Sequence, residues 1–170
     1  MRTRHAIVDT PIGELTVVAA GDAIAGIYFP RHWTMPPLET IGERVAVGED
    51  PLLEAAWVQL AEYLDGQRTE FDLPTRTSGS DFQERVWAIL RQIPFGETTT
   101  YGAIAEELGD RALAREVGGA VGRNPLSIVV ACHRVIGADG SLTGYAGGLD
   151  RKRSLLELEG AIDPEPVPLF

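Results

Sequence analysis

The sequence contains a single cysteine, Cys132, and lacks any long run of apolar residues. One cysteine excludes an internal disulfide and any zinc site with several cysteine ligands, so the thiol must serve packing or reactivity. No apolar stretch approaches the roughly 20 residues that span a bilayer, and the first residues lack the basic and then apolar pattern of a secretion signal. We therefore expect a cytoplasmic protein without membrane contact, where a free thiol stays reduced.

Basic residues are also scarce, because 15 Lys and Arg face 25 Asp and Glu and give a formal net charge of −10. Over the whole chain this balance argues against DNA binding, since affinity for a duplex depends on neutralised phosphates. Between residues 111 and 153, however, seven basic residues outnumber three acidic ones. This basic segment predicts weak, salt-sensitive and sequence-independent DNA binding, although each of its arginines taken singly fits an ordinary solvated surface.

The first half of the chain has the pattern of a small sheet followed by one helix. Apolar runs at residues 5–8, 15–19 and 24–29 are separated by glycine-containing turns, which predicts a meander of three strands. Residues 30–50 show little periodicity and are expected to form a loop. Asp50 and Pro51 then supply an N-cap and a first-turn proline for a helix that ends at Gly66. Residues 71–74 have the pattern of a last edge strand, and residues 75–79 that of a linker.

The second half is predicted to be mainly helical. Ser80 and Gln83 form a capping box for a helix that extends to about residue 93. Two shorter helices, 101–108 and 112–122, are joined by a tight turn, which is typical of a helix-turn-helix. The second of them is rich in Ala and Gly, which permits close approach either to another helix or to a nucleic acid groove, and composition alone does not choose. A strand-like apolar stretch precedes Cys132, and residues 149–158 complete the domain as a helix closed by glycine.

These elements predict a mixed α/β (α+β) protein with two domains. A small sheet-plus-helix domain is expected over residues 1–76, and a helix-turn-helix domain over residues 77–170. The sequence contains no internal repeat, glycine-rich phosphate loop or low-complexity segment.

Three elements in fixed order carry a family resemblance: Asn124-Pro125, then Cys132-His133-Arg134-Val135, then Gly144-Tyr145-Ala146-Gly147-Gly148. In order and spacing, over roughly residues 80 to 160, the chain resembles the O6-alkylguanine-DNA alkyltransferases. The resemblance implies a winged helix-turn-helix-like second domain and transfer of one alkyl group from O6-alkylguanine in duplex DNA to the protein's own cysteine. It leaves O4-alkylthymine open as a second substrate. It also implies minor-groove contact with nucleotide flipping, a monomer and no cofactor, and it leaves cooperative binding along DNA open.

The resemblance implies a role for each residue of the reaction centre. Cys132 would be the nucleophile, and His133 the base, reached through irregular backbone or a bridging water. Glu159 would orient the imidazole. Tyr101 would donate a hydrogen bond to the leaving guanine and would crowd the phosphate that rotates when the nucleotide leaves the stack. Asn124 would be a hinge that connects the recognition helix, residues 112–122, to the cysteine loop, the loop that contains Cys132. From the residues alone, His133 also fits a core histidine and Glu159 a solvated helix end.

The resemblance also implies the contacts with DNA and with the flipped base. Arg115 would be the finger that fills the space left by the base, whereas by composition it is one more exposed helical arginine. The other DNA contacts expected are Tyr101, Ala114, Gly118 and Arg123. The residues expected to line the base pocket are Tyr145, Val135, Ala146 and Gly147.

Two departures from the family pattern keep other functions open. Ala131 stands where the family usually has Pro, which is expected to loosen the cysteine loop, and Ala146 stands where Ser is common. A displaced loop would fit a non-catalytic sensor of alkylated DNA, and a Cys-His pair also fits a thiol hydrolase that turns over repeatedly. The scattered His5, His32 and His133 have no ligand spacing, so no metal is expected.

Overall fold

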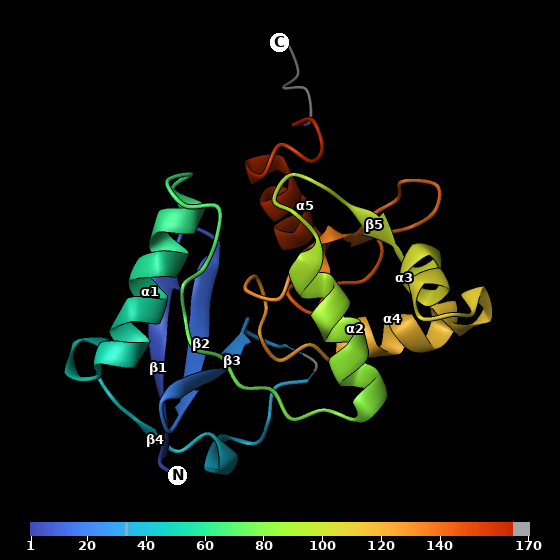
Figure 1. Ribbon diagram of the computed structural model, residues 1–170. Coiled ribbons are helices and arrows are strands. Elements are labelled where there is room, and N and C mark those ends of the chain that lie inside the picture. Colours follow the sequence, from blue (N-terminus) through green and yellow to red (C-terminus); the bar gives the residue numbers. More distant parts are fainter. Residues whose placement is uncertain (33, 165–170) are drawn as a thin grey trace, which may run out of the picture.

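The N-terminal half of the chain is a four-stranded sheet with one covering helix (Figure 1). The computed structural model describes residues 1–32 and 34–164. Strands β1 (Thr3–Thr10), β2 (Gly13–Ala20) and β3 (Ala23–Tyr28) form an antiparallel meander, and β4 (Glu43–Arg44) pairs parallel to β1, in the order β3-β2-β1-β4. Helix α1 (Pro51–Leu64) lies against one face of the sheet. The predicted meander and helix are confirmed.

Two expectations for this half are wrong. The segment expected to be a loop, residues 30–50, contains β4 and two 3₁₀ turns, η1 (Leu38–Thr40) and η2 (Val47–Glu49). The edge strand expected at residues 71–74 does not form. The segment around residues 71–75 pairs with β3 only at a single isolated bridge, between Thr75 and Ile24. A continuous ladder would need an amide donor at each alternate residue, and Pro74 has none.

Helix α1 begins where the sequence predicts. The Asp50 carboxylate accepts hydrogen bonds from the amides of Leu52 and Leu53, and it also pairs with Arg4 of β1 at 2.6 Å. The buried stripe of α1 consists of Leu53, Ala56, Leu60 and Tyr63. The last of these side chains points beyond the sheet, into the second half of the protein, where its hydroxyl finds a partner.

The second half is helical and contains the predicted helix-turn-helix. Its elements are α2 (Asp81–Gln92), β5 (Thr99–Thr100), α3 (Tyr101–Glu107), η3 (Arg111–Leu113), α4 (Ala114–Gly122), η4 (Cys132–Arg134), β6 (Val135–Ile136) and α5 (Leu149–Leu158). The capping box of Ser80 and Gln83 is present at the start of α2. Strands β5 and β6 pair in parallel and form a second, two-stranded sheet.

The small residues of α4 serve helix packing on one side of the helix and leave its other side open, so close approach to a nucleic acid groove stays a prediction. Its buried side packs against α2, where the Trp87 indole donates to the Ala120 carbonyl at 2.8 Å. On the other side Gly119 is exposed, with open space around it. The helix therefore combines tight internal packing with a smooth outer surface.

The two halves meet along β3 and share one continuous apolar core. The amide of Ile27 in β3 donates to the carbonyl of Pro125, two residues beyond Arg123 at the end of α4. The chain that follows Pro125 leads to the cysteine. The cysteine loop therefore lies at the junction of the sheet and the helical half (Figure 1).

Candidate active site

The backbone around Cys132 is a series of tight turns, and the strand expected before the cysteine is absent. The amide of Val129 donates to the carbonyl of Ser127 at 2.9 Å, across Ile128, whose φ is 75°. A positive φ in a β-branched residue is a genuine outlier and costs on the order of 1–3 kcal/mol. The buried Ile128 side chain holds this conformation within the core. These turns form hydrogen bonds between residues two apart in the chain, so this segment cannot form a β-ladder with another strand. The strand that does pair with β5, β6, begins only after the cysteine.

Ala131 forms the second of these turns and sets the direction of the cysteine. The amide of Cys132 donates to the carbonyl of Val130 at 2.8 Å, with φ −78° and ψ 59° at Ala131, which is an inverse γ-turn. Proline fixes φ near −65 ± 15°, and the Ala131 amide donates no hydrogen bond within the described residues. Alanine thus adopts the conformation that proline would impose, contrary to the expected loosening.

Asn124 connects the end of α4 to this loop. Its side-chain amide donates to the Val130 carbonyl at 2.8 Å, and its side-chain oxygen accepts from the Leu126 amide at 3.0 Å. These are side-chain-to-backbone bonds of the kind that the hinge role requires. Since Asn124 is buried, losing either bond would leave a polar group without a partner.

Glu159 is the centre of a buried hydrogen-bond cluster. Its Oε2 lies 2.8 Å from His133 Nε2, 2.8 Å from Arg134 Nη2 and 2.5 Å from the Tyr63 hydroxyl, and its Oε1 lies 2.8 Å from Arg134 Nε. The exposed fraction is 0% for His133 and 5% for Glu159. The interpretation of Glu159 as a solvated helix end is wrong, because the carboxylate folds back into the core from the C-cap residue of α5.

The ionisation states within this cluster follow from burial and from its hydrogen bonds. Burial alone would raise the pKa of Glu159, but the donors His133, Arg134 and Tyr63 hold it at about 2. Burial lowers the pKa of His133, with Arg134 and Lys152 acting in the same direction and Glu159 against them. The carboxylate is therefore charged and the imidazole neutral at neutral pH, so Nε2–H donates to Glu159. The other ring nitrogen, Nδ1, is buried and forms no hydrogen bond within the described residues.

The thiol of Cys132 is protonated at rest. Burial raises its pKa, and the side chain of Asn124 and the charge of Lys152 offset part of that effect. Lys152 is itself buried and donates to the carbonyls of Val135 and Thr143 at 2.6 and 2.9 Å. Burial lowers the pKa of this ammonium to about 8. The site thus brings together a neutral thiol, a neutral imidazole and a nearby cation.

A small cavity adjoins the thiol. Its volume is about 10 Å³, and its lining residues are Val121, Gly122, Asn124, Ser127, Cys132, Gly144, Tyr145 and Ala146. That volume is close to the room that one water molecule needs. Two residues expected in the pocket lie outside this lining. Val135 is fully buried in β6, and Gly147 lies against the ring of Phe29.

Tyr101 lies beside the recognition helix. Its hydroxyl is 2.7 Å from the hydroxyl of Thr143, and its ring faces Gly118 of α4. Ala114 lies at the start of the same helix and is half-buried. Arg115 and Arg123 are exposed, and their side chains form no hydrogen bond or ion pair within the described residues.

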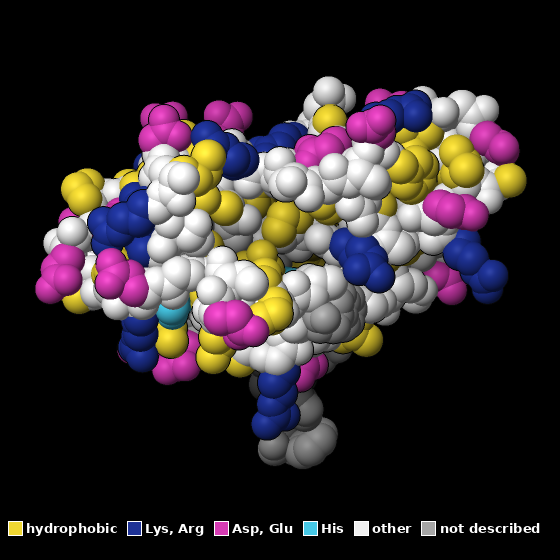
Figure 2. Space-filling view, turned by 90° about the horizontal axis from the view of Figure 1, so that it is seen from below, with side chains coloured by type: hydrophobic (Ala, Val, Ile, Leu, Met, Phe, Trp, Pro, Cys, Tyr) yellow, Lys and Arg dark blue, Asp and Glu magenta, His cyan; other side chains and the backbone are white. Residues whose placement is uncertain are grey.

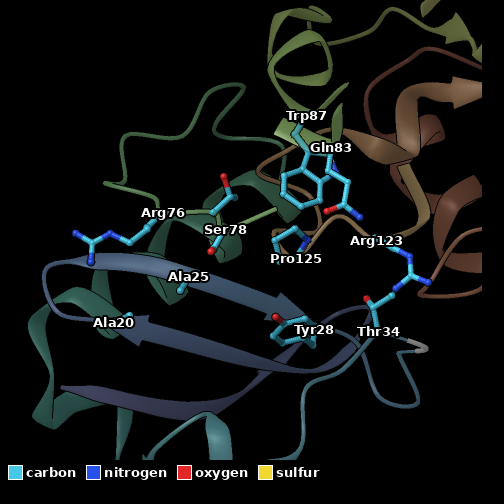
Figure 3. A pocket seen from close by; sticks show the side chains of 11 residues that line it. Ala20, Ala25, Tyr28, Thr34, Arg76, Ser78, Gln83, Trp87, Arg123 and Pro125 are labelled. Atoms are coloured by element: carbon cyan, nitrogen blue, oxygen red, sulfur yellow. The ribbon is translucent and has the colours of Figure 1, made fainter. Parts of the chain in front are cut away.

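Arg123 lies at one end of a groove between the two halves, with Arg76 at the other (Figure 3). The groove has a volume of about 470 Å³, and Trp87 and Pro125 lie between the two arginines. None of the described residues that line it is acidic.

The basic segment is less available to a partner than its charge suggests. Arg134 and Lys152 are buried, Arg111 pairs with Glu106, and Arg151 donates to the carbonyls of Ile12 and Gly147. Figure 2 shows acidic and basic side chains interspersed over one face of the molecule, without a continuous basic area. Arg134 and Lys152 are therefore not part of the solvated basic surface that the charge of this segment indicates.

Comparison with known proteins agrees with this geometry. Residues 3–77 match the family described as 6-O-methylguanine DNA methyltransferase, ribonuclease-like domain, and residues 81–161 match the DNA binding domain of the same name. The chain belongs to the 6-O-methylguanine DNA methyltransferase family.

Relatives within this family match along almost their whole length. A methylated-DNA–protein-cysteine methyltransferase of Mycobacterium tuberculosis is 44% identical over 96% of both chains. One from Methanosarcina acetivorans is 42% identical over 92% of this chain and 98% of its own. The solved structure of M. tuberculosis OGT in complex with DNA superposes with a TM-score of 0.82 at 43% identity, covering 92% of each chain. The predicted mixed α/β fold is confirmed by this similarity.

For this family member, sequence reasoning misses two residues of the Glu159 cluster, Arg134 and Tyr63, and the neighbouring Lys152. Arg134 lies inside the motif at residues 132–135, yet by charge alone it groups with the surface arginines, as does Lys152. Tyr63 lies in the other half of the chain and gives no signal beyond its place on the apolar stripe of α1. Within residues 1–32 and 34–164 no group of three His, Cys, Asp or Glu is arranged to hold a metal, and no helix there could cross a membrane.

Replacement of Ala131 by proline, the residue common in the family, is expected to stabilise the protein. Ala131→Pro should raise the free energy of unfolding by about 0.4–1 kcal/mol, because the native φ is already compatible and only the unfolded chain loses freedom. Urea unfolding at pH 7 measures the change. Ala131→Gly is the control and should be destabilising. A destabilised proline variant would show that the Ala131 amide is needed.

Glu159→Gln should destabilise the fold by about 3 kcal/mol at pH 7, because Arg134 and His133 would lose a buried charged partner. The pKa of Glu159 is lowered by folding, so its stabilisation is complete above the ordinary glutamate pKa of about 4.3 and is lost as the pH falls toward about 2. Urea titrations between pH 7 and pH 3 should show the gap between wild type and variant narrowing below about pH 4.5.

Glu62→Gln is the matched control for this titration, since Glu62 pairs with Arg68 at the surface. Its effect should stay below about 1 kcal/mol. A gap for Glu159→Gln that is constant with pH would contradict the buried-carboxylate assignment.

Proposed function

We propose that the protein repairs DNA directly, by moving the alkyl group of O6-alkylguanine in a duplex onto Cys132. The observation that carries the proposal is the buried hydrogen bond between Glu159 and His133, the residue that follows Cys132 in the cysteine loop. The chain also belongs to a family whose relatives are named for this transfer. A DNA partner is further supported by the similarity to a structure of M. tuberculosis OGT bound to DNA.

The first chemical step is activation of the thiol. His133 Nε2–H is engaged by Glu159, so Nδ1 is the nitrogen left to accept a proton. We infer that Nδ1 removes the proton of Cys132, directly or through one water molecule, as the thiolate forms. The negative Glu159 and the resulting imidazolium stabilise each other, while Lys152 favours the thiolate.

The second step is a displacement at the alkyl carbon. The sulfur of Cys132 forms a bond to this carbon as the bond to guanine O6 breaks, and the electron pair leaves with the base. The Tyr101 hydroxyl is the donor proposed to support the charge that develops on guanine. The product is a thioether, which has no leaving group that would restore the thiol. Each chain therefore reacts once, and no cofactor takes part.

DNA would lie along the outer surface of α4. Ala114 and Gly118 would allow a close approach, Arg115 would fill the gap in the base stack, and Arg123 would contact phosphate. Asn124 would transmit the position of the helix to the cysteine loop. The exposed Arg123 favours a polyanion at its end of the groove, because no acidic side chain lines the groove within the described residues, whereas Arg76 at the other end already pairs with Asp22 at 3.5 Å.

A flipped base needs more room than the resting site provides. A cavity of about 10 Å³ holds a water molecule but not a purine. Tyr145 and Ala146 form one wall of it, and both belong to the segment that ends with Gly147 and Gly148. We infer that this segment moves when the base enters, and that Val135 and Gly147 then form the rest of the proposed pocket.

The decisive experiment is the intact mass of the protein after incubation with duplex DNA that carries one O6-methylguanine. We expect one added methyl group per chain, located by peptide mapping at Cys132, and no further increase with excess substrate. Cys132→Ala should show no added mass and should keep its affinity for DNA. Lesion binding with unchanged mass would instead establish a non-catalytic sensor, and repeated turnover of a small ester would indicate a thiol hydrolase.

Arg115→Ala should separate base extrusion from chemistry. The reaction with alkylated duplex should slow by at least about tenfold, because extruding a base costs a few kcal/mol that the finger would help to offset. The reaction with free O6-benzylguanine should be unchanged, since a free base needs no extrusion. Arg111→Ala, which removes an exposed arginine paired with Glu106 on the same motif, is the control. Equal losses on both substrates would rule out the finger role.

A further inference from the structure

Tyr63 is the one side chain of the N-terminal sheet-and-helix half that bonds to the Glu159 carboxylate within the described residues. It lies in the last turn of α1, 96 residues before Glu159 in the sequence. Its hydroxyl donates to Glu159 Oε2 at 2.5 Å, the same oxygen that accepts from His133 Nε2. Tyr63 and the proposed base therefore share one acceptor atom.

The position of this hydroxyl is fixed by packing. The Tyr63 side chain is 1% exposed, and its ring centroid lies 5.3 Å from that of Phe71 and 6.2 Å from that of Phe95. Phe95 also lies beneath the Arg134 guanidinium, at 5.8 Å. Tyr63 and Arg134, the two donors to Glu159 other than His133, therefore both pack against the ring of Phe95.

The hydroxyl can act only as a donor. Burial, followed by the charge and hydrogen bond of Glu159, raises the pKa of Tyr63, so the phenol is protonated at neutral pH and donates to the carboxylate. A phenol so placed neither accepts the thiol proton nor contacts the substrate. Its contribution must therefore act through the carboxylate.

We propose that Tyr63 is a positioning residue for alkyl transfer, whose hydroxyl holds the Glu159 carboxylate in line with His133. The proposal rests on the proposed function. Arg134 pulls on both oxygens of the carboxylate from one side, and it is itself anchored to the Ile93 carbonyl at 2.6 Å. Tyr63 supplies a third, rigidly held contact on Oε2, beside those of Arg134 and His133. Without it the carboxylate is free to turn toward Arg134, and its bond to His133 lengthens.

The pH dependence expected from this role involves every charged group that faces the cluster. Tyr63 approaches from α1, His133 and Arg134 approach from η4, and Lys152 of α5 acts on both His133 and Cys132. A weaker His133–Glu159 contact stabilises the imidazolium less. Formation of the thiolate by proton transfer then becomes harder, and the pH at which the reaction reaches half its maximal rate rises.

The test is Tyr63→Phe, which removes one oxygen and keeps the ring. Second-order rates with free O6-benzylguanine and with duplex O6-methylguanine are measured from pH 6 to pH 10. We expect a loss of about tenfold at pH 7 on both substrates, which corresponds to about 1.4 kcal/mol of activation free energy. The deficit should shrink toward high pH, where the thiolate forms without the base. Affinity for DNA should not change.

Tyr28→Phe is the matched control, because it removes the hydroxyl of another buried tyrosine of the same sheet-and-helix half, on the far side of β3 from the cluster. With free O6-benzylguanine, whose reaction does not involve the Arg123 groove that Tyr28 lines, it should react like the wild type. A double-mutant cycle with Glu159→Gln supplies a second readout, since a residue that acts through Glu159 has little further effect on the rate once the carboxylate is gone.

The outcomes separate the inference from the function on which it rests. An inert wild-type protein would refute the proposed function itself. With an active wild type, an unchanged Tyr63→Phe rate, a loss that is equal at every pH, or a full additional loss in the Glu159→Gln background would each overturn the positioning role. A pH-dependent loss that disappears in that background supports it, and thermal unfolding of each variant confirms that the compared proteins are folded.

Discussion

The buried carboxylate of Glu159 is the group on which the rest of the site depends. A single ionised side chain in the core is costly unless donors surround it, and this one receives four hydrogen bonds, from Tyr63, His133 and twice from Arg134. Those donors come from α1 and η4, while the carboxylate comes from the end of α5. The carboxylate therefore joins the N-terminal half, the cysteine loop and the last helix, and it keeps the imidazole in the tautomer whose Nδ1 can accept a proton.

A second constraint lies in the backbone of the cysteine loop. Ile128 has a positive φ that is costly for a β-branched residue, and Ala131 closes an inverse γ-turn immediately before the nucleophile. Asn124 bonds to Val130, whose carbonyl also accepts from the Cys132 amide. A displacement of α4 would therefore move the Cys132 sulfur, because the Asn124 side chain and the Val130 carbonyl connect the helix to the cysteine. This arrangement explains how a loop with no regular structure can hold a nucleophile in one place.

Much of the fold could be predicted from local sequence signals. The three-strand meander, the caps at Asp50 and Ser80 and the two short helices all follow from patterns that act over a few residues. The errors have a common cause in long-range contacts. β4 consists of two residues that pair only because β1 offers a free edge, and the apolar run before Cys132 is buried without being a strand. Cys132, His133 and Glu159 could be chosen only through the family resemblance, because no local pattern shows that residue 159 folds back onto residue 133. Tyr63 lay beyond both kinds of reasoning.

The charge of −10 remains to be reconciled with a DNA partner. Acidic groups on remote surfaces are screened over about 8 Å at physiological salt, so they oppose binding less than their number suggests. The buried Arg134 and Lys152 support the chemistry of Glu159 and Cys132 and cannot neutralise phosphates. Each phosphate contact contributes about 0.9 to the slope of the logarithm of DNA affinity against the logarithm of salt concentration. Because few arginines are left at the surface near α4, the total slope must be small. A protein of this kind gains little from charge attraction. In the proposed reaction its selectivity would then arise after contact, when a damaged base leaves the stack more readily than a normal one and meets the thiol.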